Sequence, residues 1–146
     1  MGFNFTIQES KLIKGIWIIK PSLSEDNRGN IWTSFLKSEI ENLLPDELYF
    51  KHDKFSESKN NVLRGIHGDK KTWKLVTSVY GEIYQVVVDC RKESPSYSKW
   101  EAFTINKSQQ SMILLPPGVG NAYCVTSEFS VYHYKLAYPD GYNDIE

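Results

Sequence analysis

The sequence predicts an all-β protein, either a sandwich or a small barrel of antiparallel strands. Short runs rich in β-branched and aromatic residues recur along the 146 residues, with Gly, Pro, Asn or Asp between them. Only one short segment has a helical pattern. With 40% hydrophobic residues the chain is large enough to bury a core, and it has no internal repeat or linker-like stretch. We therefore expect a single domain over residues 1–146.

In the first half of the chain, the apolar run Ile-Trp-Ile-Ile after Gly15 predicts a strand over residues 15–20. A second strand is expected over 30–36. A short helix over 37–44 should follow at the periphery, where Ser38 can cap its first turn and Pro45 ends it. Residues 48–54 form the next expected strand.

The second half contains the clearest strand signals. Residues 80–82, Tyr-Gly-Glu, indicate a turn into the apolar strand over 82–89. Residues 115–122 contain two prolines and two glycines. These residues predict an extended backbone that is followed by a sharp turn. The strands expected in this half cover residues 62–67, 74–80, 82–89, 100–105, 111–115, 120–126 and 130–136.

Composition narrows the possible functions. The 17 basic and 18 acidic residues leave a net charge of -1, so nucleic acid is not expected as a partner. No apolar stretch approaches the roughly 20 residues that cross a bilayer, so no membrane association is expected. Cys90 and Cys124 are the two cysteines, and the start of the chain lacks a signal-peptide pattern. We therefore expect a cytoplasmic protein.

The segment Val-Leu-Arg-Gly-Ile-His, residues 62–67, carries the most chemistry. A spacing of three on a regular strand puts Arg64 and His67 on opposite faces, unless a glycine bulge intervenes. Gly65 is the residue that can supply the bulge. If both side chains reach one cavity, the pair suits an anionic substrate whose proton is removed by His67.

Two further polar residues have alternative interpretations. Asp89 ends an apolar run, so its carboxylate either makes turn hydrogen bonds with the residues that follow or is the ionic partner of a lysine such as Lys74. Asn121 either faces a ligand or tolerates a left-handed backbone in its Gly-rich turn. The sequence leaves both questions open.

Five segments together resemble the nucleotide-sugar 3,5-epimerases typified by dTDP-4-dehydrorhamnose 3,5-epimerase. Residues 26–29 are similar to its D-x-R-G segment, 62–67 to V-L-R-G-L-H, and 74–76 to K-L-V. Residues 81–91 resemble G-x-v-x-D-V-A-V-D-x-R, and 94–100 resemble S-P-T-f-G-x-W. Order and spacing agree over roughly residues 16 to 138.

The resemblance implies a cupin-type jelly roll (double-stranded β-helix) that forms a homodimer. It also implies an isomerase, independent of cofactor and metal, that epimerises a nucleotide-linked 4-keto-6-deoxy sugar at C3 and/or C5 by proton abstraction and return. It implies that His67 is the general base and Tyr134 the opposing general acid, with Lys74 near the developing enolate. The substrate-binding residues implied in this way are Arg28, Arg64, Lys74, Asp53, Lys54, Asn121 and Tyr138. A 3,4-ketoisomerase and a non-catalytic module that binds nucleotide sugars or carbohydrates are the alternatives.

The chain also departs from the family pattern. Asn121 stands where the family's G-F-A-H-G segment has histidine, and residues 52–54 replace Q-D-N. Thr33 aligns with a family glutamate. The acidic residue that orients the catalytic histidine in the family lies beyond the matched region, so Asp53, Asp89 or another subunit is expected to substitute for it.

Overall fold

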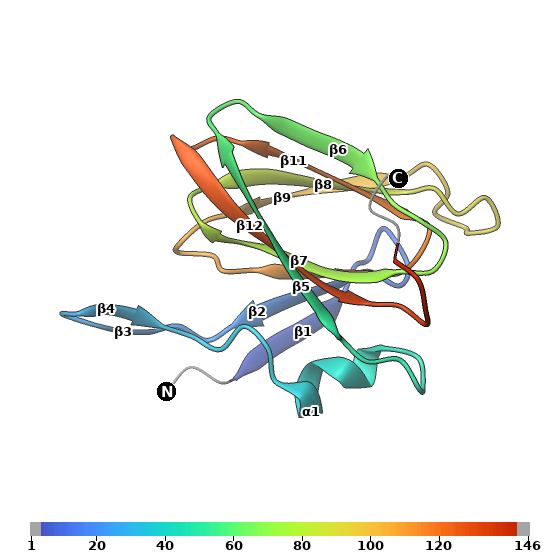
Figure 1. Ribbon diagram of the computed structural model, residues 1–146, viewed down its shortest axis with the longest axis horizontal. Coiled ribbons are helices and arrows are strands. Elements are labelled where there is room, and N and C mark those ends of the chain that lie inside the picture. The colour runs from blue at the N-terminus through green and yellow to red at the C-terminus, as the bar shows by residue number, and fades with distance from the viewer. Residues whose placement is uncertain (1–3, 143–146) are drawn as a thin grey trace.

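The computed structural model describes residues 4–142, which form two facing antiparallel β-sheets and a separate hairpin (Figure 1). The strand order in the six-stranded sheet is β1 (Phe5–Glu9), β2 (Trp17–Pro21), β10 (Met112–Leu115), β7 (Trp73–Tyr80), β12 (Phe129–Ala137) and β5 (His52–Lys59). The order in the four-stranded sheet is β6 (Leu63–His67), β11 (Val119–Val125), β8 (Ile83–Asp89) and β9 (Trp100–Ile105). This jelly-roll arrangement confirms the all-β prediction.

The main core lies between the two sheets. β8 alternates buried and more exposed residues, so one of its faces packs inward. Val87 from β8 and Tyr123 from β11 meet Val76 and Tyr132 from the six-stranded sheet in one buried cluster. Burial of such side chains contributes about 1.5–3 kcal/mol each. Side chains that share the face of these residues therefore point between the sheets.

A second cluster covers part of the outer face of the six-stranded sheet. Here α1 (Lys37–Ile40) and the 3₁₀ turn η1 (Glu41–Leu43) place Ile40 and Leu44 against Leu75 of β7. Because β7 is covered on both faces, residues 74–78 are buried without alternation. The short peripheral helix was correctly predicted, but Ser38 does not cap it, since Leu36 is the N-cap and makes no side-chain capping bond.

The strand predictions for the second half of the chain agree with β6 to β12 within two residues. The prediction over 30–36 is wrong beyond Ile31, where β4 (Gly29–Ile31) ends its hairpin with β3 (Ser24–Asp26). The strand expected over 48–54 begins only at His52 and runs to Lys59. β1 and β3 were not predicted. Pairing with β2 orders β1, which has no strong apolar run of its own.

β6 contains the irregularity on which the position of its side chains depends. His67 lies opposite Asn121 of β11, and Arg64 lies opposite Tyr123, so three steps along β6 match two along β11. Gly65 has φ of +138°, and a Cβ at this position would contact the Ala122 side chain and lie 2.7 Å from the Ala122 Cα. The glycine bulge, which the sequence left as a possibility at Gly65, is present, and it brings Arg64 and His67 to the same face.

Candidate active site

The inner face of β6 carries the first part of the site. Directly opposed residues in an antiparallel pair point to the same side, so His67 shares the inward face of Asn121. Arg64 donates from Nε to the Ser58 Oγ at 2.8 Å, a contact that joins β6 to β5 across the two sheets. The His67 side chain is exposed, and within residues 4–142 no hydrogen bond to its imidazole is formed. The ring is open to a substrate.

The opposite sheet supplies the second part of the site. Tyr134 of β12 packs against the main core and lies opposite Val76 on β7 and Lys54 on β5. The Lys54 Nζ lies 5.7 Å from the centre of the Tyr134 ring. Lys74 is two residues before Val76 on β7, so it points to the same inner face, and it is only 8% exposed. A phenol and two ammonium groups therefore share one end of the inner face.

The surroundings of Tyr134 keep its phenol protonated. Burial, and then the neighbouring Tyr123, raise the pKa of Tyr134 well above its usual value. The Ser56 hydroxyl and the positive charge of Arg64 lower that pKa by smaller amounts. The phenol is therefore a proton donor throughout the neutral pH range.

Asp69 places a carboxylate beside Lys74. Its Oδ1 accepts from the backbone N–H of Lys71 at 2.8 Å and of Thr72 at 2.6 Å. Burial acts to raise the pKa of Asp69, but these hydrogen bonds and the charge of Lys74 outweigh it and lower the pKa. The loop that follows His67 thus holds a carboxylate whose charge interacts with the lysine on β7.

Tyr138 follows β12 at the same end of the molecule. The Tyr138 hydroxyl lies 3.2 Å from the His52 Nδ1, and the Lys51 Nζ lies 4.7 Å from the centre of the Tyr138 ring. Tyr142 stacks on Tyr138 with ring centres 5.3 Å apart. The result is an aromatic and cationic margin next to Lys54, whose Nζ is 6.0 Å from the Tyr142 ring centre.

The structure places Asp53 outside this group. Asp53 neighbours Lys54 on β5 and so points to the opposite, outer face of the sheet. There its Oδ1 lies 2.8 Å from the His133 Nε2 and 2.8 Å from the Lys135 Nζ. Asp53 is therefore not placed to contact a substrate bound near Tyr134, nor to orient His67.

Of the two alternatives for Asp89, the structure has the hydrogen bonds to the residues that follow, not an ion pair with Lys74. Asp89 is fully buried at the end of β8 and accepts from the Arg91 Nε at 2.8 Å and from the Ser96 Oγ at 2.6 Å. Burial alone would raise the pKa of Asp89, but these bonds dominate and hold it well below its usual value. The suggested pairing of Asp89 with Lys74 is therefore wrong, and Asp89 does not orient His67.

Arg28 lies in the turn of the hairpin β3–β4. This hairpin extends away from the two sheets (Figure 1). The Arg28 Nη2 pairs with the Asp26 Oδ2 at 2.5 Å, and the Arg28 side chain is 87% exposed. Within one chain the hairpin and the His67 end of β6 lie on different sides of the molecule (Figure 1).

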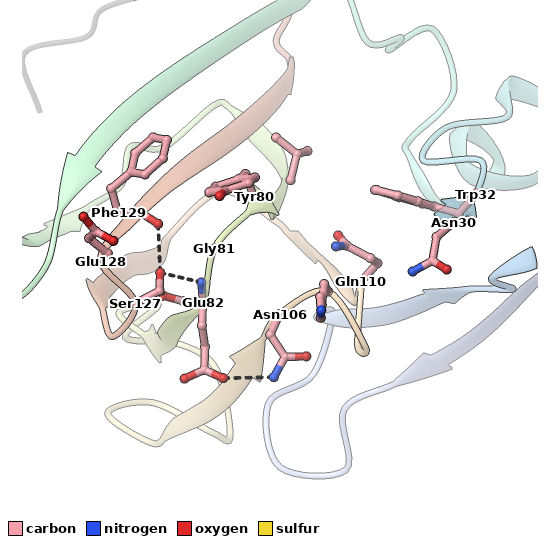
Figure 2. A pocket seen from close by; sticks show the side chains of 12 residues that line it. Asn30, Trp32, Tyr80, Gly81, Glu82, Asn106, Gln110, Ser127, Glu128 and Phe129 are labelled. Carbon is pink, nitrogen blue, oxygen red and sulfur yellow. Dashed lines mark hydrogen bonds between the residues drawn. The ribbon is translucent and has the colours of Figure 1, made fainter. Parts of the chain in front are cut away.

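A cavity of about 630 Å³ lies at the other end of the sheets, between the β3–β4 hairpin and the turns β7–β8 and β11–β12 (Figure 2). Its lining includes Trp32, Tyr80 and Phe129, but none of the residues that the sequence marks as site residues. Glu82 in its wall is held by Asn106 at 3.0 Å. We assign the site to the His67 end, because Lys54, Lys74 and Tyr134 share the inner face there, opposite the sheet that carries His67.

Within residues 4–142 no cluster of three or more His, Cys, Asp or Glu side chains suits a metal ion. No helix in the same range is long and apolar enough to cross a membrane.

Comparison with known proteins decides the family. The model of the family described as dTDP-4-dehydrorhamnose 3,5-epimerase matches residues 10–144. The chain belongs to this family. It is 32% identical over 126 residues to the dTDP-4-dehydrorhamnose 3,5-epimerase of Salmonella typhimurium, covering 84% of this chain and 69% of that protein.

Solved structures of this epimerase family have the same fold. The dTDP-6-deoxy-D-glucose-3,5-epimerase of Legionella pneumophila, in complex with dTDP-4-keto-L-rhamnose, matches with a TM-score of 0.85 and 29% identity, over 94% of this chain and 74% of that one. A 4-keto-6-deoxy sugar epimerase from the novobiocin gene cluster of Streptomyces spheroides matches with a TM-score of 0.87 and 26% identity, over 99% of this chain and 72% of that one.

Several residues of this epimerase-family site were not singled out from the sequence. No role was given to His52, Gln85, Tyr123 or Tyr132. The available signal was the strand period of two, because His52 shares a face with Lys54, and Tyr132 shares one with Tyr134. It shows which residues share a face, but not how far each side chain reaches.

Proposed function

We propose that this protein is an isomerase that epimerises a nucleotide-linked 4-keto-6-deoxy sugar at C3, C5 or both. The observation that carries the proposal is the bulge at Gly65, which turns Arg64 and His67 to the inner face, toward the sheet that carries Tyr134. A base and an acid on opposed sheets suit removal of a proton from one face of a carbon and its return to the other. Membership of the epimerase family and the sugar nucleotide bound in the Legionella relative support this substrate class.

In the proposed reaction, the His67 imidazole takes the proton from the carbon beside the ketone. The electron pair moves into the carbonyl and forms an enolate, whose oxygen is stabilised by the Lys74 ammonium group. The Tyr134 phenol then donates its proton to the opposite face of the carbon and inverts the configuration. Tyr134 recovers a proton from solvent and His67 releases one, so protons balance without a redox cofactor or metal.

Binding of the nucleotide is assigned to the cations and aromatic rings around this centre. Arg64 has a guanidinium geometry that suits the diphosphate, and Lys54 lies on the same face as Tyr134. The Tyr138 ring at the margin suits a nucleobase. In this proposal the enzyme works in the cytoplasm, where Cys90 and Cys124, both free thiols, stay reduced.

The proposed enzyme is a homodimer, and the position of Arg28 supports this state. Because Arg28 lies on the projecting hairpin, it reaches a His67 centre only if that centre belongs to a second copy. Ile31 at the end of the same hairpin is 65% exposed, as expected for a surface that another chain covers. Two-fold symmetry would give each site one Arg28 from the other chain.

Deuterium exchange from solvent tests the proposed function. With a dTDP-4-keto-6-deoxy sugar in D₂O, deuterium at C3 and C5 indicates a double epimerase, and deuterium at C3 alone indicates a single epimerase or a ketoisomerase. His67→Ala should lower exchange by about 10²–10⁴-fold and leave nucleotide affinity nearly unchanged. His133→Ala on the outer face is the matched control and should retain exchange. Nucleotide-sugar binding without exchange in the wild type would refute the enzyme and indicate a binding module.

A further inference from the structure

A buried hydrogen-bond network joins the two sheets beneath the proposed centre. Tyr132 donates from Oη to the Gln85 Oε1 at 2.5 Å, and the Asn121 Nδ2 donates to the Tyr132 Oη at 3.3 Å. The Gln85 Nε2 donates to the Asn121 Oδ1 and closes the ring of contacts. Tyr132 and Gln85 are 0% exposed and Asn121 is 3% exposed. Each of the three side chains thus bonds to both of the others.

The network lies next to both proposed catalytic groups. Asn121 is the cross-strand partner of His67, and Gln85 lies on the neighbouring strand β8. Tyr132 is on the opposite sheet, two residues before Tyr134, and its ring meets the Tyr134 ring edge-on with centres 4.8 Å apart. The network therefore joins β12, which carries the acid, to β11, the strand paired with β6 that carries the base.

The three side chains stay neutral over a wide pH range. Burial raises the pKa of Tyr132 well above its usual value, and the amides of Gln85 and Asn121 do not titrate. The family motifs that residues 81–91 and 118–122 resemble have aspartate at the position of Gln85 and histidine at that of Asn121. At both positions this chain has an amide, and both amides bond to the Tyr132 hydroxyl.

We propose that Tyr132, held by Gln85 and Asn121, is a positioning residue that sets the separation between His67 and Tyr134. The inference rests on the proposed function, because it assigns Tyr134 the role of the acid. Inversion requires both groups to be within reach of one carbon, and a displacement of about 1 Å can cost on the order of 10²-fold in rate. Asn121 then acts through the network rather than by contacting the substrate.

Tyr132→Phe tests the proposal because it removes the bridging hydroxyl and keeps the aromatic ring. Turnover should fall about 10- to 100-fold, with KM nearly unchanged. Deuterium exchange without inversion should increase relative to inversion, because His67 still abstracts the proton while Tyr134 is displaced. Thr77→Val is the matched control: it removes a buried hydroxyl that donates to the Ser111 carbonyl at 2.8 Å on the outer face of the same sheet. An unchanged ratio of exchange to inversion in Tyr132→Phe would overturn the proposal.

A second measurement does not depend on activity. In protein labelled with ¹³C at the tyrosine Cζ, the Tyr134 signal is assigned by its loss in Tyr134→Phe and its position is measured at neutral pH. Tyr132→Phe should shift this signal, because the ring is no longer held in its buried position. If the wild type lacks exchange, the proposed function fails, whereas an unchanged Tyr134 signal in Tyr132→Phe refutes the positioning role.

Discussion

Replacing Gly65 by alanine tests whether the bulge in β6 creates the site. Gly65 has φ of +138°, a region that residues with a side chain rarely adopt. A Cβ there would contact the Ala122 Cβ, lie 2.7 Å from the Ala122 Cα and lie 3.0 Å from the Asn121 carbonyl oxygen. Backbone atoms of β11 cannot move aside as a flexible side chain does. The two strands must separate, and His67 must move from Asn121.

The size of the effect follows from two contributions. Forcing a non-glycine residue into the positive-φ region costs about 1–3 kcal/mol. Overpacking against β11 costs about 1–3 kcal/mol more. Gly29→Ala separates the backbone cost from the overpacking cost. Gly29 has φ of +130°, but nothing lies within 4 Å of its added Cβ. Gly65→Ala should therefore lose ~1–3 kcal/mol more unfolding free energy than Gly29→Ala.

Urea denaturation followed by far-UV circular dichroism measures both losses. The double variant Gly65→Ala/Ala122→Gly should recover part of the stability, since the Ala122 Cβ is gone while its Cα and the Asn121 carbonyl remain. Deuterium exchange by folded Gly65→Ala should also fall, because His67 is displaced. Equal destabilisation by Gly65→Ala and Gly29→Ala would refute the argument that close packing against β11 requires glycine.

Three further predictions concern the acid, the buried carboxylate and the dimer. Tyr134→Phe should block inversion while His67 still exchanges the substrate proton, and full inversion by this variant, measured by NMR of the product, would exclude Tyr134 as the acid. Because the pKa of Asp89 is lowered in the folded state, its ionised form stabilises the fold above pH ~4, and this stability is lost as the pH falls toward the lowered value. Asp89→Asn should therefore cost ~3 kcal/mol at pH 7 and flatten the acid limb of the stability curve, whereas an unchanged limb in urea titrations would contradict the assignment. Re-formed equal mixtures of Arg28→Ala and His67→Ala should regain about a quarter of wild-type sites, and no recovery of activity would show that Arg28 does not act across a dimer.

The strands that the sequence predicts well are those whose local pattern agrees with their burial. β8 and β9 follow the apolar and β-branched runs within one residue of the predicted limits. β5 is the contrasting case, because its sequence after Lys54 is polar and its ladder with β12 orders it. The hairpin β3–β4 is also specified by pairing rather than by apolar character. The β-propensity of a short segment does not contain information about these strand pairings, so the sequence pattern did not predict them.

The sequence by itself determined the family pattern, the antiparallel class and the segment in which a cation, a glycine and an imidazole occur together. Only the tertiary structure decided which face of each strand points inward and which side chains meet there. In the folded protein Asp53 lies on the outer face of its sheet, and Asp89 forms an ion pair with Arg91. Asn121 and Tyr132 form a hydrogen bond between the two sheets. The physical reason is that one bulge reverses the facing of a strand, and that hydrogen bonds between sheets join residues far apart in the chain.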